Sequence, residues 1–445
     1  MDWVSFGLLL KANEVLYCII FAASAIFYAL LFRRMFISIL DPFFFALIFS
    51  VFGFSVVWFL YFTKSIDARY LVSYLLTQIA FWAGLFTFKS LRRREILSKV
   101  KVVRIEDEEL LEKIFFVTVS SIYIMIQLAS YGLIGIPLLL SSHIDIYNNS
   151  GGLGILGRAL DVLKPCAIFM LVWFLFKRSG SISFKTYQYF FLLMLLLFFA
   201  LSGSKGEFML LGFIVFCFLI LNASRFKQVF RKLRRLEILI IGAGLCFVFF
   251  TIFAQSTENG ITSNNLQFFA FRLVSSGDAY FFAYPNHNIE HISGSQPFLA
   301  LFGDIFSTVR LIPREQQPQI LGLQLFQMFS KLDIITGPNA RQNVFGYVYF
   351  GFFGSIVFSY LIGFLLSLVR NRLYFNLRRN IFTQLFFVLL YINLAGIETD
   401  PPQAISEVEN VMLILPVIIF ITGFFYLMLK KSSSEYNLLT EGKIS

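Results

Sequence analysis

Charged residues are scarce in this chain, and their scarcity excludes a soluble globular protein. Of the 445 residues, 14% are Asp, Glu, Lys or Arg, whereas 58% are hydrophobic. Soluble domains carry about 25% charged residues. The composition therefore indicates a polytopic integral membrane protein.

Cysteine is scarce as well. The chain has four cysteines, Cys18, Cys166, Cys217 and Cys246, and each lies within an apolar run. None belongs to a CxxC pair or to a Cys/His pattern with metal-ligand spacing. We therefore expect neither structural disulfides nor a zinc site.

The chain also lacks the basic patch on a folded module that nucleic-acid binding requires. Its net charge is +11, but the Lys and Arg residues lie in short loops between apolar runs. Such a distribution is a topology signal. We expect a lipid bilayer as a partner and no nucleic acid.

Long apolar runs dominate the sequence instead. A helix needs about 20 residues to cross a bilayer. Runs of about this length occur at residues 15–32, 42–62, 69–88, 114–133, 159–176, 187–202, 208–222, 237–255, 344–369, 381–396 and 409–429. They predict an all-α polytopic membrane protein with about 11 transmembrane helices.

The positive charges predict the orientation of these helices. Most of the 37 Lys and Arg residues fall in alternate loops, on one side of the predicted bundle. The positive-inside rule assigns that side to the cytoplasm, so the N-terminus is expected outside and the C-terminus inside. The first run is followed by Arg33 and Arg34 rather than by a small-residue cleavage site, which is typical of a retained helix.

One long polar passage divides the apolar runs into two groups. It predicts three regions: eight helices in residues 1–255, a large outer loop in 256–343, and three helices with a cytoplasmic tail in 344–445. Within the loop, Phe and Leu alternate with polar residues at helical spacing, and prolines interrupt the pattern. We expect short amphipathic helices that lie across the mouth of the bundle as a lid.

Ionisable residues also occur at membrane depth. Asp161 and Lys164 are one turn apart on one helix face. Such groups are costly in lipid and usually face protein or a wet cavity, so this pair either lines a cavity or neutralises itself. Lys205 lies in a Gly-rich turn between two short runs, and its side chain either points into a cavity or extends outward to water.

The residues able to carry chemistry concentrate on the predicted outer side. The sequence has no Gly-rich nucleotide loop, no DxD sequence and no Asp-rich first outer loop, which hold divalent ions in metal-dependent lipid-linked glycosyltransferases. We therefore expect metal-free chemistry and no cofactor. Candidate general bases are His143, Asp278, His287 and Glu398. Candidate phosphate-binding cations are Arg158, Lys205, Arg272 and Arg341, since guanidinium forks bind phosphate and stay charged.

Each candidate also has a simpler interpretation. Arg272 pairing with Asp278 would hold the loop, and Arg341 would serve as a lipid-headgroup anchor. Each histidine would be an ordinary residue on the loop surface.

Four patches resemble a known family. They are the turn Gly203-Ser-Lys-Gly206, Arg272 near the start of the large loop, Pro338-Asn339, and the sequence from Tyr347 to Gly354 with the spacing Tyr-x-x-Phe-Gly-x-x-Gly. In order and layout the chain resembles the Wzy-type O-antigen polymerases, relatives of the O-antigen ligases. In the last patch, Gly351 and Gly354 are expected to permit close helix packing.

The resemblance implies a reaction and a location. It implies transfer of a growing polysaccharide from undecaprenyl pyrophosphate to an incoming lipid-linked repeat unit, at the periplasmic face of the bacterial inner membrane. The leaving pyrophosphate needs preorganised positive charge, expected from Arg272 and Arg341 with Lys205 in support. The acceptor hydroxyl needs a base. The family also works with a chain-length regulator, which is therefore an expected partner.

Two rival functions remain open at this point. An O-antigen ligase, which moves the polymer to lipid A core, would share the architecture and the donor. The late His typical of ligases is missing here, because that region reads Arg341-Gln-Asn343, and this favours a polymerase. A flippase for the same lipid-linked units would be expected to show repeated halves and short loops.

Overall fold

The computed structural model describes residues 1–98, 109–139, 154–177, 180–202, 204, 206–232, 242, 273–329, 337–377 and 380–441. These residues form helices and turns and contain no strand. Clustering of contacts divides the chain into two units. Unit 1 comprises Met1–Lys101, Leu219–Asn376 and Tyr391–Ser406, and unit 2 comprises Val102–Phe218, Leu377–Leu390 and Glu407–Ser445.

Seven of the described helices are long and apolar enough to cross a membrane. They belong to α2 (Glu14–Phe32), α3 (Pro42–Phe62), α6 (Glu109–Ile134), α8 (Gly154–Lys177), α9 (Ile182–Ser202), α16 (Gln342–Ser367) and α19 (Pro401–Glu441). The protein is thus a helical, multi-pass membrane protein, as predicted. The predicted number of eleven spans is not confirmed, and the run 237–255 lies almost wholly outside the described residues.

Three predicted runs correspond to helices outside this set of seven. They are α4 (Ala68–Leu85), α10 (Gly206–Leu221) and α18 (Ile381–Ala395), of which α10 and α18 are apolar but too short for a span. The sequence did not predict α1 (Trp3–Ala12), whose Phe6 is buried and stacks on Phe281 with ring centroids 4.1 Å apart.

The large loop contains short helices, as expected. The described ones are η2 (Ser275–Gly277), α13 (Asp278–Ala283), η3 (Pro285–His291), α14 (Pro297–Thr308), η4 (Arg314–Gln316) and α15 (Leu321–Gln327).

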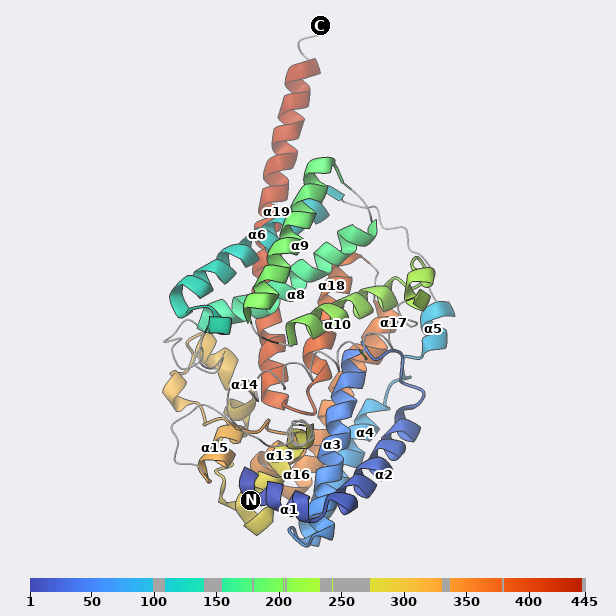
Figure 1. Ribbon diagram of the computed structural model, residues 1–445. Coiled ribbons are helices and arrows are strands. Elements are labelled where there is room, and N and C mark those ends of the chain that lie inside the picture. Colours follow the sequence, from blue (N-terminus) through green and yellow to red (C-terminus); the bar gives the residue numbers. More distant parts are fainter. Residues whose placement is uncertain are drawn as a thin grey trace. The chain divides into compact units, whose positions relative to one another are not determined.

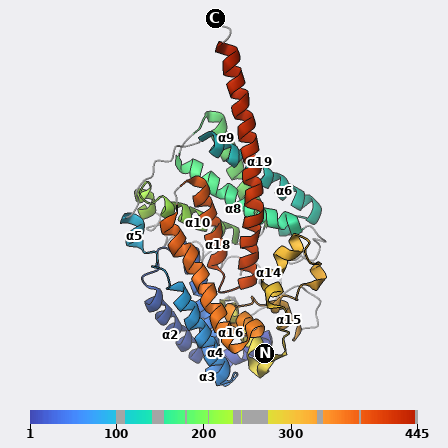
Figure 2. The same ribbon diagram turned by 180° about the vertical axis from the view of Figure 1, so that it is seen from behind.

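The core of unit 1 is built from α2, α3, α4 and α16, which lie side by side (Figures 1 and 2). The α4–α16 contact is the closest, because glycines remove the side chains between the two backbones. A Cβ on Gly84 would lie 2.2 Å from the Tyr360 carbonyl oxygen, and one on Gly363 would lie 2.1 Å from that of Phe81. Close helix packing therefore occurs at Gly84 and Gly363. It was predicted at Gly351 and Gly354: a Cβ on Gly351 would meet nothing within 4 Å, whereas one on Gly354 would lie 2.7 Å from the Phe350 Cβ.

Helix α16 is two helical arms and not one straight span. Gly351 has φ 68° and ψ −175°, a conformation that only glycine adopts readily. The chain reverses there, and the Phe358 ring of the second arm lies 5.5 Å from Phe345 and 5.1 Å from Phe350 of the first arm. We call residues 342–350 the first arm and 352–367 the second arm. The predicted run 344–369 is therefore a hairpin.

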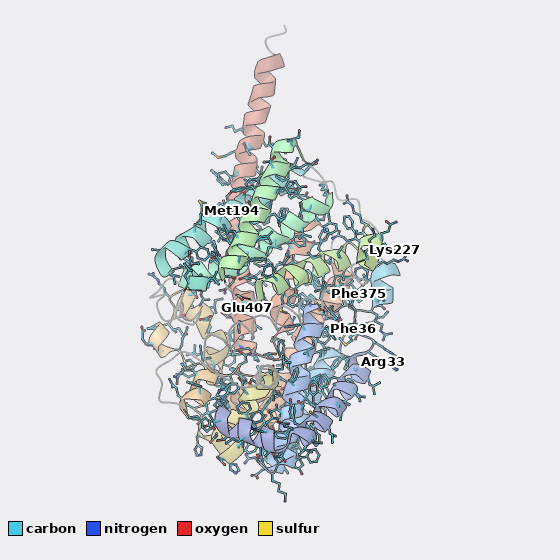
Figure 3. All side chains as sticks on the ribbon, in the orientation of Figure 1. Arg33, Phe36, Met194, Lys227, Phe375 and Glu407 are labelled. Carbon is cyan, nitrogen blue, oxygen red and sulfur yellow. The ribbon has the colours of Figure 1, made fainter. Side chains whose placement is uncertain are left out.

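Basic loops gather at one end of unit 1, which we call the basic end. The segment after α2 meets η5 (Leu368–Leu373), where the Arg370 guanidinium pairs with Asp41 at 2.8 Å. The segment after α4 meets η5 too, since the Leu91 amide donates to Asn371 Oδ1 at 2.9 Å. Arg33 and Lys227, which are labelled in Figure 3, lie toward this end of unit 1. These loops were predicted to share one side of the membrane.

Unit 2 contains α6, α8 and α9, with most of α10, the first part of α18 and most of α19. Two ion pairs lie in its described interior. Glu112 accepts from Trp173 Nε1 at 3.1 Å and from Lys177 Nζ at 3.2 Å. Lys164 pairs with Glu207 across α8 and α10 at 2.6 Å. The sequence predicted that Lys164 either lines a cavity with Asp161 or is neutralised by it, and did not predict the pairing with Glu207.

Candidate functional site

Arg341 occupies the centre of a buried polar region in unit 1. Its side chain is 1% exposed. The guanidinium donates to the Ser276 carbonyl, to the Phe49 carbonyl at 3.2 Å and to Thr399 Oγ1 at 3.4 Å. Arg341 thereby ties together the large loop, the middle of α3 and the turn between α18 and α19. In this arrangement its donors bind three protein oxygens.

The backbone around Arg341 is shaped to admit this side chain. Arg341 itself has φ 41°, in the left-handed region. Its amide donates to the Thr399 carbonyl at 2.8 Å, and the next amide, of Gln342, donates to the Glu398 carbonyl at 3.0 Å. Gly53 of α3 leaves the space, because a Cβ there would lie 3.0 Å from the Tyr280 ring and 3.7 Å from the guanidinium.

Glu398 lies in the same region and is 5% exposed. Its carboxylate accepts from Ser50 Oγ at 2.6 Å and from Gln78 Nε2 at 2.9 Å. Asn343, at the start of the first arm, donates to Gln78 Oε1 at 3.3 Å and accepts from the Tyr280 hydroxyl at 2.8 Å. Burial raises the pKa of Glu398 above its usual value. A carboxyl enclosed in this way can hold a proton, and both of its oxygens already accept from protein groups. We call this group, with Arg341, the Arg341 cluster.

Two further carboxyls border the Arg341 cluster. Burial raises the pKa of Asp278 to about 7, although the positive charge of Arg341 opposes the increase. Burial likewise raises the pKa of Asp400. Arg341 and Asp278 are thus electrostatic neighbours, whereas the sequence had offered Arg272 as the partner of Asp278.

A second cluster lies at the other end of unit 1 from the basic end. His287 of η3 contacts the Asp67 carboxylate through Nε2 at 3.3 Å and the Tyr70 hydroxyl through Nδ1 at 2.7 Å. The same hydroxyl donates to Glu290 Oε1 at 2.9 Å. Arg69 pairs with that oxygen at 3.0 Å and donates to the Tyr347 hydroxyl at 2.7 Å. We call these residues the His287 cluster.

The His287 cluster is open to solvent on one side only. The side chains of His287 and Asp67 are 51% and 65% exposed, and that of Arg69 is 58% exposed. Tyr70, by contrast, is 1% exposed, with its ring stacked on Tyr284 at 5.4 Å. The cluster therefore presents a base, two carboxylates and a cation to whatever binds there.

The backbone of η3 supports a functional interpretation of this cluster. Asn286 and His287 have φ values of 56° and 57°, in the left-handed region that non-glycine residues rarely occupy. Such conformations cost about 1–3 kcal/mol each and persist when surrounding contacts enforce them. Here the two contacts of the imidazole enforce the position of the ring.

Tyrosines connect the two clusters. Tyr284, which stacks on Tyr70, has its ring 5.7 Å from Tyr280, and Tyr280 reaches Asn343. Tyr280 also contacts Tyr74 edge to face at 5.1 Å. Burial raises the pKa of both Tyr280 and Tyr284, so their hydroxyls stay protonated.

The predicted site residues are thus distributed over several places. Arg341, Glu398 and Asp278 come together in the interior, and His287 lies in the exposed cluster. Arg158 belongs to unit 2, where it donates to Asn410 Oδ1 at 3.0 Å. His143, Lys205 and Arg272 lie outside the described residues, so the roles predicted for them stay predictions.

Sequence reasoning missed Asp67, Arg69, Tyr70 and Glu290 as one group. The loop at 63–68 is short, and Arg69 and Tyr70 fall at the start of an apolar run, so both were assigned to a span. The available signal was the sequence Asp67-Ala-Arg-Tyr70, which places two charges beside a predicted membrane end.

Among the described residues, no group of three or more His, Cys, Asp or Glu side chains is arranged to hold a metal ion. In comparisons with known proteins, no family model, curated protein or solved structure matches the chain. The function must therefore be inferred from the chain's own residues.

Proposed function

We propose that the chain is a glycosyltransferase that polymerises lipid-linked oligosaccharide repeat units, as the Wzy-type O-antigen polymerases do. The growing chain moves from undecaprenyl pyrophosphate to an incoming undecaprenyl-pyrophosphate-linked unit. The reaction needs no metal and takes place at the periplasmic face of the bacterial inner membrane, with the N-terminus outside and the C-terminus in the cytoplasm.

The observation that carries the proposal is the location and composition of the His287 cluster. A histidine held between carboxylate and tyrosine has the chemistry of a general base for a sugar hydroxyl. The cluster is exposed, and it lies at the end of unit 1 away from the basic loops. By the positive-inside rule, that end faces the periplasm.

The donor half of the reaction requires cations. When the glycosyl group leaves, negative charge develops on the pyrophosphate, and preorganised positive charge lowers the barrier by roughly 2–4 kcal/mol per group. Arg69 is exposed and close to His287 through Glu290, which supports a role for it beside the predicted Arg272 and Lys205. Arg341 binds the pyrophosphate only if its guanidinium first gives up its hydrogen bonds to the Ser276 and Phe49 carbonyls.

A transporter of the same lipid-linked units is the second candidate. It is favoured by the α16 hairpin, whose first arm begins beside the buried Glu398. Discontinuous helices and ionisable groups at membrane depth are typical of transporters. A ligase shares the donor and the overall layout, and the same experiment separates all three functions.

The test is deletion of the gene in its native host, with analysis of the surface polysaccharide on a silver-stained gel. Core carrying a single repeat unit is the expected result, because units are then delivered and ligated but not polymerised. Polymerised chains that accumulate on the lipid carrier would instead identify a ligase. Core without any repeat unit, with units retained at the cytoplasmic face, would identify the transporter.

Complementation of the deletion with variants tests whether the His287 cluster carries the activity. Wild type and His291→Asn should restore the ladder at matched membrane abundance, because His291 lies in the same helix but outside the cluster. His287→Ala should not restore it, and neither should Arg69→Ala. If all four proteins restore a full ladder, the proposed site is wrong even where the polymerase activity is established.

A further inference from the structure

The His287 cluster contains one contact whose donor can be deduced. Tyr70 and Glu290 are 2.9 Å apart, hydroxyl to carboxylate. An ionised carboxylate paired with Arg69 has no proton to give, so Tyr70 is the donor in that contact. A phenol has one proton. The Tyr70 oxygen can therefore only accept in its 2.7 Å contact with His287 Nδ1.

This deduction fixes the proton on the imidazole. Nδ1 must carry a hydrogen in order to donate to Tyr70, so in neutral His287 the nitrogen without a hydrogen is Nε2. Nε2 faces the exposed side of the cluster, toward Asp67, while the Tyr70 side is buried. In a free histidine the other tautomer, with the hydrogen on Nε2, is favoured, so the arrangement imposes the less common one.

We infer that Tyr70 and Glu290 are positioning residues that hold His287 as a base with Nε2 open to the acceptor hydroxyl, and that Asp67 stabilises the imidazolium formed. The inference rests on the proposed function for the identity of the acceptor, which is a sugar hydroxyl. None of the three partners was predicted from the sequence.

The step balances as follows. The acceptor oxygen forms a bond to the anomeric carbon of the growing chain and gives its proton to His287 Nε2. The bond between that carbon and the phosphate oxygen breaks, and undecaprenyl pyrophosphate leaves with the electron pair. The Asp67 carboxylate, 3.3 Å from Nε2, then balances the positive charge of the imidazolium. Glu290 stays paired with Arg69 throughout, and Tyr70 continues to donate to it.

The strain in η3 agrees with this assignment. His287 has φ 57°, and the contact of its Nδ1 with the buried Tyr70 hydroxyl opposes relaxation of the backbone. Loss of the Tyr70 hydroxyl removes the contact on the buried side. The ring then keeps only the exposed contact with Asp67, for which a hydrogen on Nε2 is preferred.

The test uses ¹⁵N-histidine NMR of the full-length protein in detergent, with His287 assigned from the spectrum of His287→Ala. For the neutral imidazole of wild type, the shifts should show a hydrogen on Nδ1. Tyr70→Phe should move the hydrogen to Nε2, whereas Tyr61→Phe, a matched change at the end of α3, should not. A wild-type ring with its hydrogen on Nε2, or a ring unchanged in Tyr70→Phe, would overturn the inference whether or not the protein is a polymerase.

Activity supplies the second readout, with purified lipid-linked repeat units as substrate. Tyr70→Phe should lower kcat by roughly 10-fold or more and His287→Ala by about 100-fold or more. Glu290→Gln should be milder than Tyr70→Phe, since the amide oxygen still accepts from Tyr70. If the tautomer shifts as expected but wild type has no polymerase activity, the positioning role stands and the proposed function fails. If Tyr70→Phe shifts the tautomer without lowering kcat, His287 is not the base.

Discussion

Gly346 lies against Ser355, and a Cβ on Gly346 would come within 3.1 Å of the Ser355 Cβ. The two residues are nine positions apart (355 − 346), which a continuous helix would stretch to about 13.5 Å. The hairpin at Gly351 is what brings them together. It also allows the first arm to begin inside the protein, so that Asn343 reaches Gln78 and the network around Glu398.

The hairpin predicts a conformational requirement for glycine at position 351. A Cβ at Gly351 would meet no atom within 4 Å, so Gly351→Ala creates no clash, but its φ of 68° with ψ −175° is strained for alanine. We expect a loss of about 1–3 kcal/mol in stability, seen as a lower melting temperature in detergent. Gly423→Ala in α19 is the matched control, because it too meets no atom but has no positive φ. Equal melting temperatures for the two variants would contradict the reversal.

Hydrophobic pattern and local signals were sufficient to predict most single helices. The run 42–62 coincides with α3, because Asp41 accepts from the Phe43 amide as an N-cap and Pro42 fits the first turn. The gathering of basic loops at one end of unit 1 also follows from their alternation along the chain.

Features that depend on distant or conformational information were not predictable. The reversal at Gly351 is hidden because the residues on both sides are apolar, so the run looks like one span. Asp67 and His287 are 220 positions apart (287 − 67), and no local pattern joins them. Lys164 was compared with Asp161, its neighbour on the same helix, whereas its partner Glu207 comes from another helix.

Arg341 offers a test between a structural role and a ligand-binding role. Its bonds to Ser276 and Phe49 predict that Arg341→Ala lowers stability by about 2–4 kcal/mol, because buried carbonyls lose a charged donor. Arg341→Lys should restore only part of this loss, since one ammonium cannot replace the guanidinium fork. Thermal unfolding in detergent measures both, with the exposed Arg69→Ala as control. A folded Arg341→Ala protein with wild-type stability but no polymerase activity would favour pyrophosphate binding instead.

The raised pKa of Asp278 predicts that the stability of the folded protein depends on pH. Its pKa is about 7 in the folded protein and 3.8 in the unfolded chain, so the folded state binds more protons between these values. Stability should therefore fall as pH rises from about 4 to about 7 and then level off, with a contribution of about 1–4 kcal/mol. Asp278→Asn removes this contribution, so the difference between wild type and variant should change over that range. A difference that is constant from pH 4 to pH 8 would show that Asp278 titrates normally.

The Lys164–Glu207 pair predicts an energetic coupling within unit 2. Both side chains are largely buried, at 18% and 15% exposed, and the second carboxylate oxygen of Glu207 has no partner among the described residues. Lys164→Met leaves a buried carboxylate uncompensated and should cost about 1–3 kcal/mol. The double variant Lys164→Met/Glu207→Gln should recover part of this loss, because neither charge then remains. A double-mutant cycle gives the coupling energy directly. The same cycle with Asp161→Asn is the control, and a larger coupling to Asp161 than to Glu207 would mean that the two residues on one helix face pair with each other after all.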